Sequence, residues 1–563
     1  MLSLIAGIFC QAIYVYFIIL LSKGELAWDA AHHSLWGMII YSDILQRNWL
    51  SFIFDTYRQV YWPFIHSWLL SISMLFLGPS EVSVRLVSLA AYSLTAIFLG
   101  LILYRADSGN YFISIFITLG LWLTSVEFIK AFATEALIES SVILMTSISI
   151  FIMANAFKMR SRNSSIFAGL FSMLTYFTKT DYGLILILSY LTVIIISCTR
   201  DDHKFNNYDM IIAYLIPIII LAILWFADIS KISATISALI NRQQGPQWDS
   251  YAGIIYHFIQ LIHWSDSTLI FVLLIWCFIS SFFIKRPEIV NVILVYITIS
   301  ILSHTFSQTK DAKHIIKILP WLFVLAGFIS IQIWQRINGI KYAAIYKISF
   351  ILTMSLILLF RLQYFGKVSP PDNGPTEIAT AICDGIDINI SNIIVGEYIE
   401  VSPYLIDWKL INKNINRLYL PDAKKEEFLK KINLWRKRYA WISFMEKGGQ
   451  GKIANIYHVY PVIEGNEKLQ SEKRLNRSLI MRKFDRIFVL SVNPDSPYFT
   501  EDYQRYFIHG NDLIPLILNR SDYILHGIVN FEESKVKLFI FYHRETEYSR
   551  RKADKASFGE FGK

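Results

Sequence analysis

The first residues that could do chemistry follow an apolar N-terminal segment directly, in the run Trp28–His33, which reads WDAAHH. A carboxylate beside a tryptophan at a membrane interface lies where water becomes scarce, so its pKa can rise. Asp29 could therefore act as a general base that removes a proton from a hydroxyl group. Asp29 suits a structural role equally well, because aspartate is favoured at the N-cap of a helix. The sequence leaves both roles open.

Aromatic and polar side chains then alternate in a second segment, between residues 55 and 68. Tyr61, Trp62 and His66, together with His33 of the first segment, could line a pocket for a sugar. Aromatic residues are also common where membrane helices meet water, and this belt remains the alternative interpretation.

Several basic residues could bind the phosphate of an anionic lipid, since guanidinium and ammonium groups pair well with phosphate. They are Arg58, Arg85, Lys130, Lys310, Lys313 and His314. The last three form a basic cluster with Lys317 that opens an apolar segment, where a lipid phosphate at the interface would explain so many cations. Simple snorkelling of long side chains is the alternative. Lys130 could instead form a weak surface ion pair with Glu135, five residues further on.

These residues belong to a chain of 563 residues, of which 54% are hydrophobic and only 17% charged. A soluble protein would carry more charge, so we expect an integral membrane protein. The net charge of +9 is best explained by cytoplasmic lysines and arginines that set the topology. Nucleic-acid binding is not expected, because no basic cluster is interleaved with exposed aromatic residues. The four cysteines form no CxxC pair, which argues against a disulfide framework or a zinc site.

About eleven apolar segments are candidates for membrane helices, since a crossing needs roughly 20 apolar residues. The first segment lacks a basic region and a cleavage site, so we expect it to be retained. The segments lie at about 4–22, 84–104, 110–127, 136–157, 165–178, 182–198, 209–227, 267–284, 288–303, 315–334 and 345–363.

A twelfth apolar run, residues 64–77, decides the topology. As a helix it would reach only roughly 21 Å, which is too short to cross. If it does not cross, the short basic linkers all fall on one face, which the positive-inside rule makes cytoplasmic. We therefore predict that 64–77 lies near the outer interface. The linkers carry Arg105, Lys158, Arg160, Arg162, Arg200, Lys204, Lys285, Arg286, Arg336, Lys341 and Lys347.

The composition of the sequence changes near residue 366. A turn-rich linker, Ser369–Pro375, follows the last apolar segment there. We predict a membrane domain at 1–365 and an extracytoplasmic mixed α/β domain at 366–563. Helices are expected at 426–438 and 472–481. Strands are expected at 392–395, 439–444, 453–462, 486–492, 523–529 and 536–542.

The order of these motifs resembles the GT-C superfamily of glycosyltransferases, most of all the branch with protein O-mannosyltransferases and the lipid A aminoarabinose transferase. The resemblance covers residues 1 to about 363. It rests on Asp29 with His33, Trp62-Pro63, Phe76–Ser80 leading to Arg85-Leu86, Lys130 with Glu135, Gly169 leading to Thr178-Lys179, and Lys310–His314 leading to Pro320.

The resemblance implies an inverting transfer of a sugar from a polyprenyl phosphate, on the outer face of the membrane. It assigns Asp29 as the general base on the acceptor hydroxyl, and Glu135 corresponds to the second acid of the family. The phosphate of the donor would be held by the basic residues named above. The acceptor would be a glycolipid, a polysaccharide or a protein, and neither a metal nor another cofactor is expected. The protein would be a multi-pass protein of the inner or plasma membrane.

The chain also departs from this family. Ala30 stands where an acid usually follows the first aspartate, and Glu135 replaces an aspartate. Val60–Pro63 replaces a motif in which Glu-Lys precedes a pair of prolines, so the phosphate is expected to be held differently. The outer loops lack the Trp-Trp-Asp and Asp-x-Asp motifs of oligosaccharyltransferases, which argues against N-glycosylation.

Two other functions remain open. A transporter or flippase of a lipid-linked substrate would use the same charges as a translocation path, although transporters usually carry broken helices at mid-membrane and inverted repeats. A scaffold whose outer domain binds a partner protein is the third possibility.

Overall fold

The computed structural model describes the chain outside residues 1, 21–25, 27, 58, 60–62, 107–110, 201–203, 229–230, 233–249, 308–311, 338–342, 363–373, 387–391, 396–400, 403–404, 407, 411–449, 454–455, 460–484, 498–509, 533 and 545–563. The chain divides into two compact units, and each is described by itself. The first comprises Met1–Lys23 and Asn48–Pro370, and the second comprises Gly24–Arg47 and Pro371–Lys563.

The first unit is helical, and a described helix lies in each of the eleven predicted apolar segments. Its elements are α1 (Leu2–Val15), the π-helical η1 (Tyr16–Leu20), α3 (Trp49–Tyr57), α4 (Ile65–Leu77), α5 (Glu81–Ala106), α6 (Tyr111–Leu123), α7 (Val126–Phe128), the π-helical η2 (Ile129–Ala133), α8 (Ile138–Met159), α9 (Arg162–Tyr176), α10 (Thr180–Arg200), α11 (Lys204–Phe226), α13 (Tyr251–Trp264), α14 (Thr268–Ser280), α15 (Glu288–Thr305), α16 (Ala312–Ile315), the 3-10 helix η3 (Ile316–Ile318), α17 (Leu319–Ile337) and α18 (Ala343–Leu362).

Six of these described helices are long and apolar enough to cross a membrane, or up to eight if each of two bent helix pairs counts as one span. The bent pairs are α6 with α7 and η2, at 50°, and α13 with α14, at 113°. α11 and α18 expose apolar side chains such as Ile219, Ile223 and Leu352, which suit contact with lipid. The chain is a multi-pass membrane protein.

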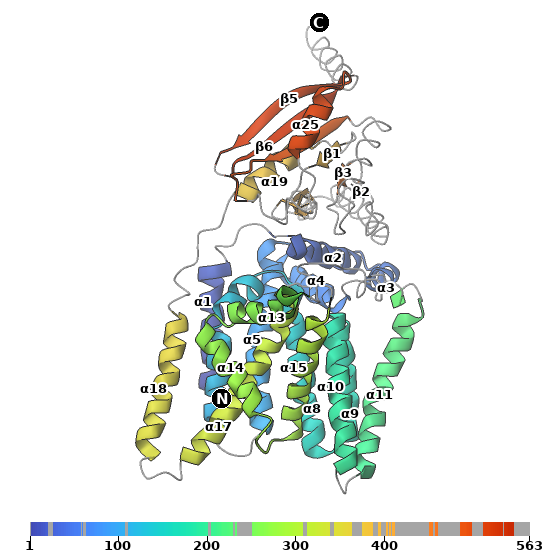
Figure 1. The fold of residues 1–563 in the computed structure, drawn as a ribbon. Coiled ribbons are helices and arrows are strands. Elements are labelled where there is room, and N and C mark those ends of the chain that lie inside the picture. The colour runs from blue at the N-terminus through green and yellow to red at the C-terminus, as the bar shows by residue number, and fades with distance from the viewer. Residues whose placement is uncertain are drawn as a thin grey trace. The chain divides into compact units, whose positions relative to one another are not determined.

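The long helices of this unit run side by side, and successive helices alternate in direction (Figure 1). One end of the bundle therefore carries the described residues of the predicted basic linkers, and there Arg160 after α8 pairs with Glu288 of α15 at 2.9 Å. The opposite end, which we call the polar end, carries charged residues at helix ends or in the turns beside them: Arg85, Glu135, Glu139, Lys179, Asp181 and Lys317.

The predicted short helix at 64–77 is confirmed as α4. It begins against the end of α9, where the backbone N–H of Ile65 donates to the carbonyl of Phe177 at 3.1 Å. Close packing of the neighbouring helices depends on Gly169, because a Cβ there would meet the Tyr214 carbonyl of α11. Small residues allow membrane helices to approach in this way.

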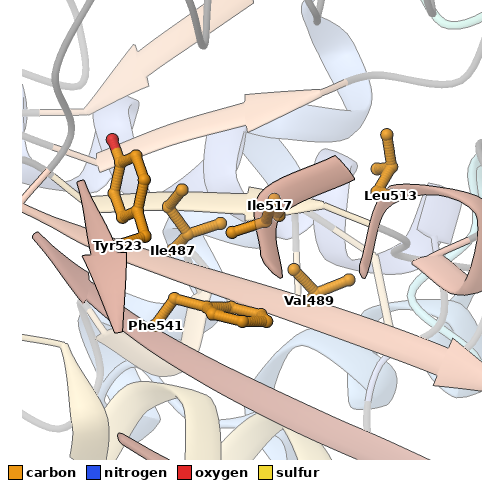
Figure 2. Packing of buried hydrophobic residues seen from close by; sticks show 6 residues of the cluster. All are labelled: Ile487, Val489, Leu513, Ile517, Tyr523 and Phe541. Atoms are coloured by element: carbon orange, nitrogen blue, oxygen red, sulfur yellow. The ribbon is translucent and has the colours of Figure 1, made fainter. Parts of the chain in front are cut away.

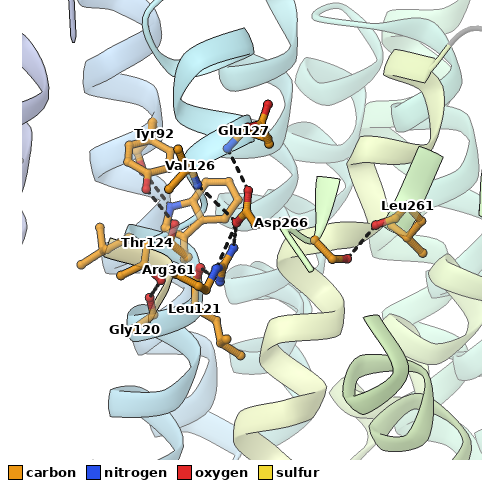
Figure 3. Close-up of polar contacts among 12 residues, drawn as sticks. Tyr92, Gly120, Leu121, Thr124, Val126, Glu127, Leu261, Asp266 and Arg361 are labelled. Atoms are coloured by element: carbon orange, nitrogen blue, oxygen red, sulfur yellow. Dashed lines mark hydrogen bonds and ion pairs between the residues drawn. The ribbon is translucent and has the colours of Figure 1, made fainter. Parts of the chain in front are cut away.

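The break between α6 and α7 is held by side chains from other helices (Figure 3). The Asp266 carboxylate, at the bend between α13 and α14, accepts from the N–H groups of Val126 at 3.3 Å and Glu127 at 2.9 Å. Arg361 of α18 donates to Asp266 and, at 2.7 Å, to the carbonyl of Leu121. The Arg361 and Asp266 side chains are only 1% and 4% exposed. This buried ion pair therefore ties both bent helix pairs to α18.

We predict that Arg361→Met will lower the free energy of unfolding by ~3–5 kcal/mol, because it leaves the Asp266 carboxylate buried without its cation. Adding Asp266→Asn should recover part of that loss, since no uncompensated charge then remains. Thermal unfolding of the three proteins in one detergent measures both effects. An Arg361→Met protein as stable as the wild type would contradict the assignment.

The second unit contains a six-stranded mixed sheet with the strand order β2-β3-β1-β4-β6-β5. β1 pairs in parallel with β3 and β4, whereas β2–β3, β4–β6 and β6–β5 are antiparallel. The mixed α/β prediction is confirmed for the described part of this region. The elements are α2 (Trp28–Leu45), α19 (Gly374–Gly385), β1 (Asn392–Val395), β2 (Gln450–Ile453), β3 (Ile456–Val459), β4 (Arg486–Val492), α25 (Gly510–Leu518), β5 (Tyr523–Phe531) and β6 (Val536–His543).

The central strand β4 is buried on both faces of the sheet. On one face, Ile487 and Val489 pack with Leu513 and Ile517 of α25 and with Phe541 (Figure 2). On the other face, Phe488 lies against Gly385 at the end of α19. Such a doubly buried strand reads as a continuous apolar run, which is why the sequence predicted it accurately. The predicted strand at 439–444 and helices at 426–438 and 472–481 lie outside the described residues.

Candidate functional site

The first ion pair of the polar end joins α8 to the turn between α9 and α10. The Lys179 ammonium donates to the Glu139 carboxylate at 2.9 Å, and the two side chains are 13% and 3% exposed. Glu139 lies in the first turn of α8, where the helix dipole favours a negative charge. In the sequence Lys179 stood out only in the Thr178-Lys179 motif, whereas the structure gives it a buried partner on another helix.

Asp181, two residues further on, is the centre of a second cluster. The Lys317 ammonium of η3 donates to the Asp181 carboxylate at 2.7 Å, and Nε2 of His304 lies 3.8 Å from the same oxygen. Lys317 is fully buried, and its ammonium stands 4.7 Å from the centre of the Tyr182 ring. Asp181 is 22% exposed, so this cluster reaches the surface of the unit.

Three histidines extend this cluster across three elements. The His304 ring at the end of α15 lies 5.1 Å from that of His314 in α16 and 5.7 Å from that of His257 in α13. Lys313, beside His314, is half-buried. The cluster thus concentrates groups that can carry positive charge or donate hydrogen bonds, which is the chemistry that holds an anion.

The third ion pair lies between α5 and the segment before α8. Nε of Arg85 stands 3.5 Å from the Glu135 carboxylate, and the side chains are 2% and 16% exposed. His66 of α4 is buried beside it, with Nδ1 2.9 Å from the Ser141 hydroxyl and Nε2 3.5 Å from the carbonyl of Ala136. The Arg85–Glu135 ion pair and His66 therefore both contact the turn that precedes α8.

A further buried cation, Lys231, follows α11. Its ammonium donates to the carbonyl of Tyr57 and lies 3.1 Å from the centre of the Tyr57 ring and 3.4 Å from that of Trp225. Burial lowers the pKa of Lys231 to about 7. This contact fixes α3 against the end of α11.

The structure brings six predicted site residues to the polar end of the first unit. Lys130 lies in the π-helical η2, which ends at Ala133, five residues before Ile138 opens α8, so Lys130 and Glu135 both precede α8. Arg58, Tyr61, Trp62 and Lys310 lie outside the described residues. The six are Arg85, Lys130, Glu135, His66, Lys313 and His314.

Asp29, His32 and His33 lie in α2 of the second unit. The helix begins at Trp28, so Asp29 occupies the first turn rather than the N-cap position, and the helix dipole stabilises its carboxylate there. His32 and His33 are both 3% exposed. Burial lowers the pKa of His32 to about 4, against a smaller opposing effect of the Asp29 charge. His32 is therefore neutral at physiological pH, beside the carboxyl group of Asp29.

Several residues of the polar end were not predicted as site residues from the sequence: Glu139, Lys179, Asp181, His257, His304 and Lys317. One feature of the sequence could have identified them. Lysine and aspartate are costly to place at the junctions of apolar membrane helices, so their presence there usually indicates a functional site. No group of three or more His, Cys, Asp or Glu residues that could hold a metal ion occurs among the described residues.

No protein-family model matches the chain, and no curated protein matches it. Two crystal structures of ArnT from Cupriavidus metallidurans do match, one bound to undecaprenyl phosphate and one in the apo state. They are 12% and 11% identical to this chain, with TM-scores of 0.54 and 0.55. Each match covers 96% of this chain and 98% of ArnT.

The chain has the fold of these ArnT structures. The match extends through the C-terminal region as well, whereas the motifs in the sequence resembled the superfamily only up to about residue 363. At such low identity the likeness shows the fold alone.

We predict that Lys179→Met will lower the free energy of unfolding by ~3–5 kcal/mol, because Glu139 then stays buried with an uncompensated charge. The double variant Lys179→Met/Glu139→Gln should regain part of that loss. Lys158→Met is the matched control, since Lys158 is exposed at the opposite end of the bundle. Thermal unfolding in detergent measures all four proteins, and equal losses for Lys179→Met and Lys158→Met would refute the pairing.

The pH dependence of stability should carry a contribution from His32. Its pKa falls from 6.5 to about 4 on folding, so the neutral form is favoured in the folded protein. This contribution is fully present above pH 6.5 and is lost as the pH falls toward 4, by at most about 3 kcal/mol. Melting temperatures between pH 7.5 and 4.5 should therefore fall more steeply for the wild type than for His32→Gln. Parallel curves would show that His32 is accessible to protons.

Proposed function

We propose that the protein is an inverting glycosyltransferase that moves a sugar from a polyprenyl phosphate to an acceptor hydroxyl on the outer face of the membrane. The observation that carries this proposal is the concentration of buried basic groups at the polar end of a fold that matches ArnT. The ArnT structure with undecaprenyl phosphate supports a polyprenyl carrier as the donor.

The polar end suits the departing phosphate. Arg85, Lys179 and Lys317 each have a carboxylate partner, and the histidines around His304 add hydrogen-bond donors. Preorganised donors in a low-dielectric site stabilise charge that develops in the transition state far better than water does. The leaving polyprenyl phosphate is such a charge.

Asp29 is the proposed general base. It removes the proton of the acceptor hydroxyl, whose oxygen forms a bond to the anomeric carbon while the bond between that carbon and the phosphate oxygen breaks. The proton remains on Asp29 and the electron pair leaves with the phosphate. A neutral His32 beside it suits this role, because a charged histidine would lower the basicity of the carboxylate.

The proposed orientation follows the basic linkers. Arg160 and Arg286 lie at the end of the bundle away from the polar end, and the positive-inside rule makes that end cytoplasmic. The reaction and the C-terminal domain would then lie outside the inner or plasma membrane. The donor is a polyprenyl-phosphate-linked sugar, and the acceptor a glycan, a lipid or a protein.

Transport of a lipid-linked substrate is the competing function. Transporter sites usually lie near the middle of the membrane, at broken helices. The ion pairs of Arg85, Lys179 and Lys317 lie at helix ends instead, which favours an enzyme that works at the interface.

We expect Asp29→Asn to lower the rate of polyprenyl phosphate release at least ~10²–10⁴-fold, because a general base contributes about that factor. The purified protein would be supplied with a panel of polyprenyl-phosphate sugars and envelope extract. Asp384→Asn, an exposed acid of α19, is the control and should keep the wild-type rate. No release by the wild type with any carrier would point to transport. Equal rates for wild type and Asp29→Asn would remove Asp29 from the mechanism.

A further inference from the structure

A groove of about 660 Å³ lies on the sheet of the second unit, and none of the site residues assigned above lines it. Its walls come from the ends of β4, β5 and β6 and from Ile514 and Pro515 of α25. The volume falls within the ~300–1,000 Å³ that is typical of small-molecule sites. α25 covers the inner part of this sheet face and leaves the ends of the strands open.

The strand register places the polar side chains of the groove in one row, formed by Ser491, Lys537 and Asn530, beside an apolar floor formed by Phe539 and Ile514. Lys537 of β6 lies directly opposite Ser491 of β4 and Asn530 of β5, so the three side chains share one face of the sheet. Phe539, two residues along β6, points to the same face. Phe539 is partly buried against the core, and Ile514 lies beside it in the groove.

The backbone of β4 and β6 limits how a ligand can bind in this groove. β4 is paired with β1 and β6, and β6 with β4 and β5, so the main-chain groups of both strands are committed to the sheet. An extended peptide that binds by adding a strand needs a free sheet edge. Over β4 and β6, recognition must therefore come from side chains, whereas β5 is the edge strand of the described sheet.

We propose that this groove binds a segment of a glycan. The hydroxyl of Ser491 and the amide of Asn530 both donate and accept hydrogen bonds, and the ammonium of Lys537 donates, which matches a ring bearing several hydroxyls. The flat ring of Phe539 and the side chain of Ile514 offer an apolar surface to the C–H face of a sugar. One apolar floor beside one polar row fits a ring that is apolar on its face and polar at its rim.

The inference rests on the proposed transferase function for its biological meaning: the glycan would be part of the acceptor, which makes the acceptor a polysaccharide or glycolipid. The groove would then hold the acceptor chain through sugars that do not react. Such a contact lowers the KM for a long acceptor without affecting a short one that cannot reach the groove.

The test is saturation-transfer NMR on the full-length protein in lipid nanodiscs. The probes are defined oligosaccharides (mannan, β-1,4-linked N-acetylglucosamine and galacturonan fragments) and the total glycan released from the envelope of the cells that make the protein. We expect transfer to at least one probe, reduced at least fivefold in Asn530→Ala and in Lys537→Ala. Both side chains are exposed, so folding should be unaffected. Asn519→Ala replaces an exposed asparagine outside the groove and should match the wild type.

The outcomes separate this inference from the proposed function. Glycan binding that depends on Asn530 and Lys537 supports the groove even if no polyprenyl carrier is turned over, in which case the transferase proposal fails alone. No binding of any probe, or binding that the two variants leave unchanged, overturns the groove even if polyprenyl phosphate is released.

Discussion

The structure of the membrane unit depends on how the break between α6 and α7 satisfies its main-chain groups. Within a membrane, each unpaired N–H or C=O costs several kcal/mol, so a broken helix survives only when other groups replace its lost hydrogen bonds. Asp266 and Arg361 do this from two other helices, and Gln11 of α1 donates to the carbonyl of Leu123 at 3.3 Å. The break turns the chain into η2, and η2 leads to Glu135.

The polar end shows how buried charge is tolerated next to apolar helices. Three cations, Arg85, Lys179 and Lys317, are each paired with a carboxylate from a different part of the chain. Breaking one such pair is costly, which fixes the helix ends rigidly relative to one another. Rigid placement is what a site needs when it must hold a leaving phosphate without rearranging.

In the second unit, the packing depends on how helices cover the two faces of the sheet. Its mixed sheet buries β4 on both faces, against α25 on one and the end of α19 on the other. α25 is a helix of nine residues, too short to cover the whole face. The uncovered strand ends therefore form a concave surface of mixed polarity, which a longer helix would have filled.

The sequence by itself determined the membrane segments and several strands, because their signals are local. It did not predict α2, α19, α25 or β2, and the single strand expected at 453–462 spans the end of β2 and β3. Apolar length marked the membrane segments, the short run at 64–77 gave α4, and continuous apolar runs gave β1 and β4 with their observed bounds. Only the tertiary structure decided the partners: Lys179 and Glu139 are 40 residues apart, and Lys317 and Asp181 are 136 apart. In the sequence, nothing distinguishes His257 and His304 from other helix residues. Only the packing of the helices brings their rings together. An ion pair needs proximity in space, and the periodicity of a sequence records only which side of a helix or strand a residue faces.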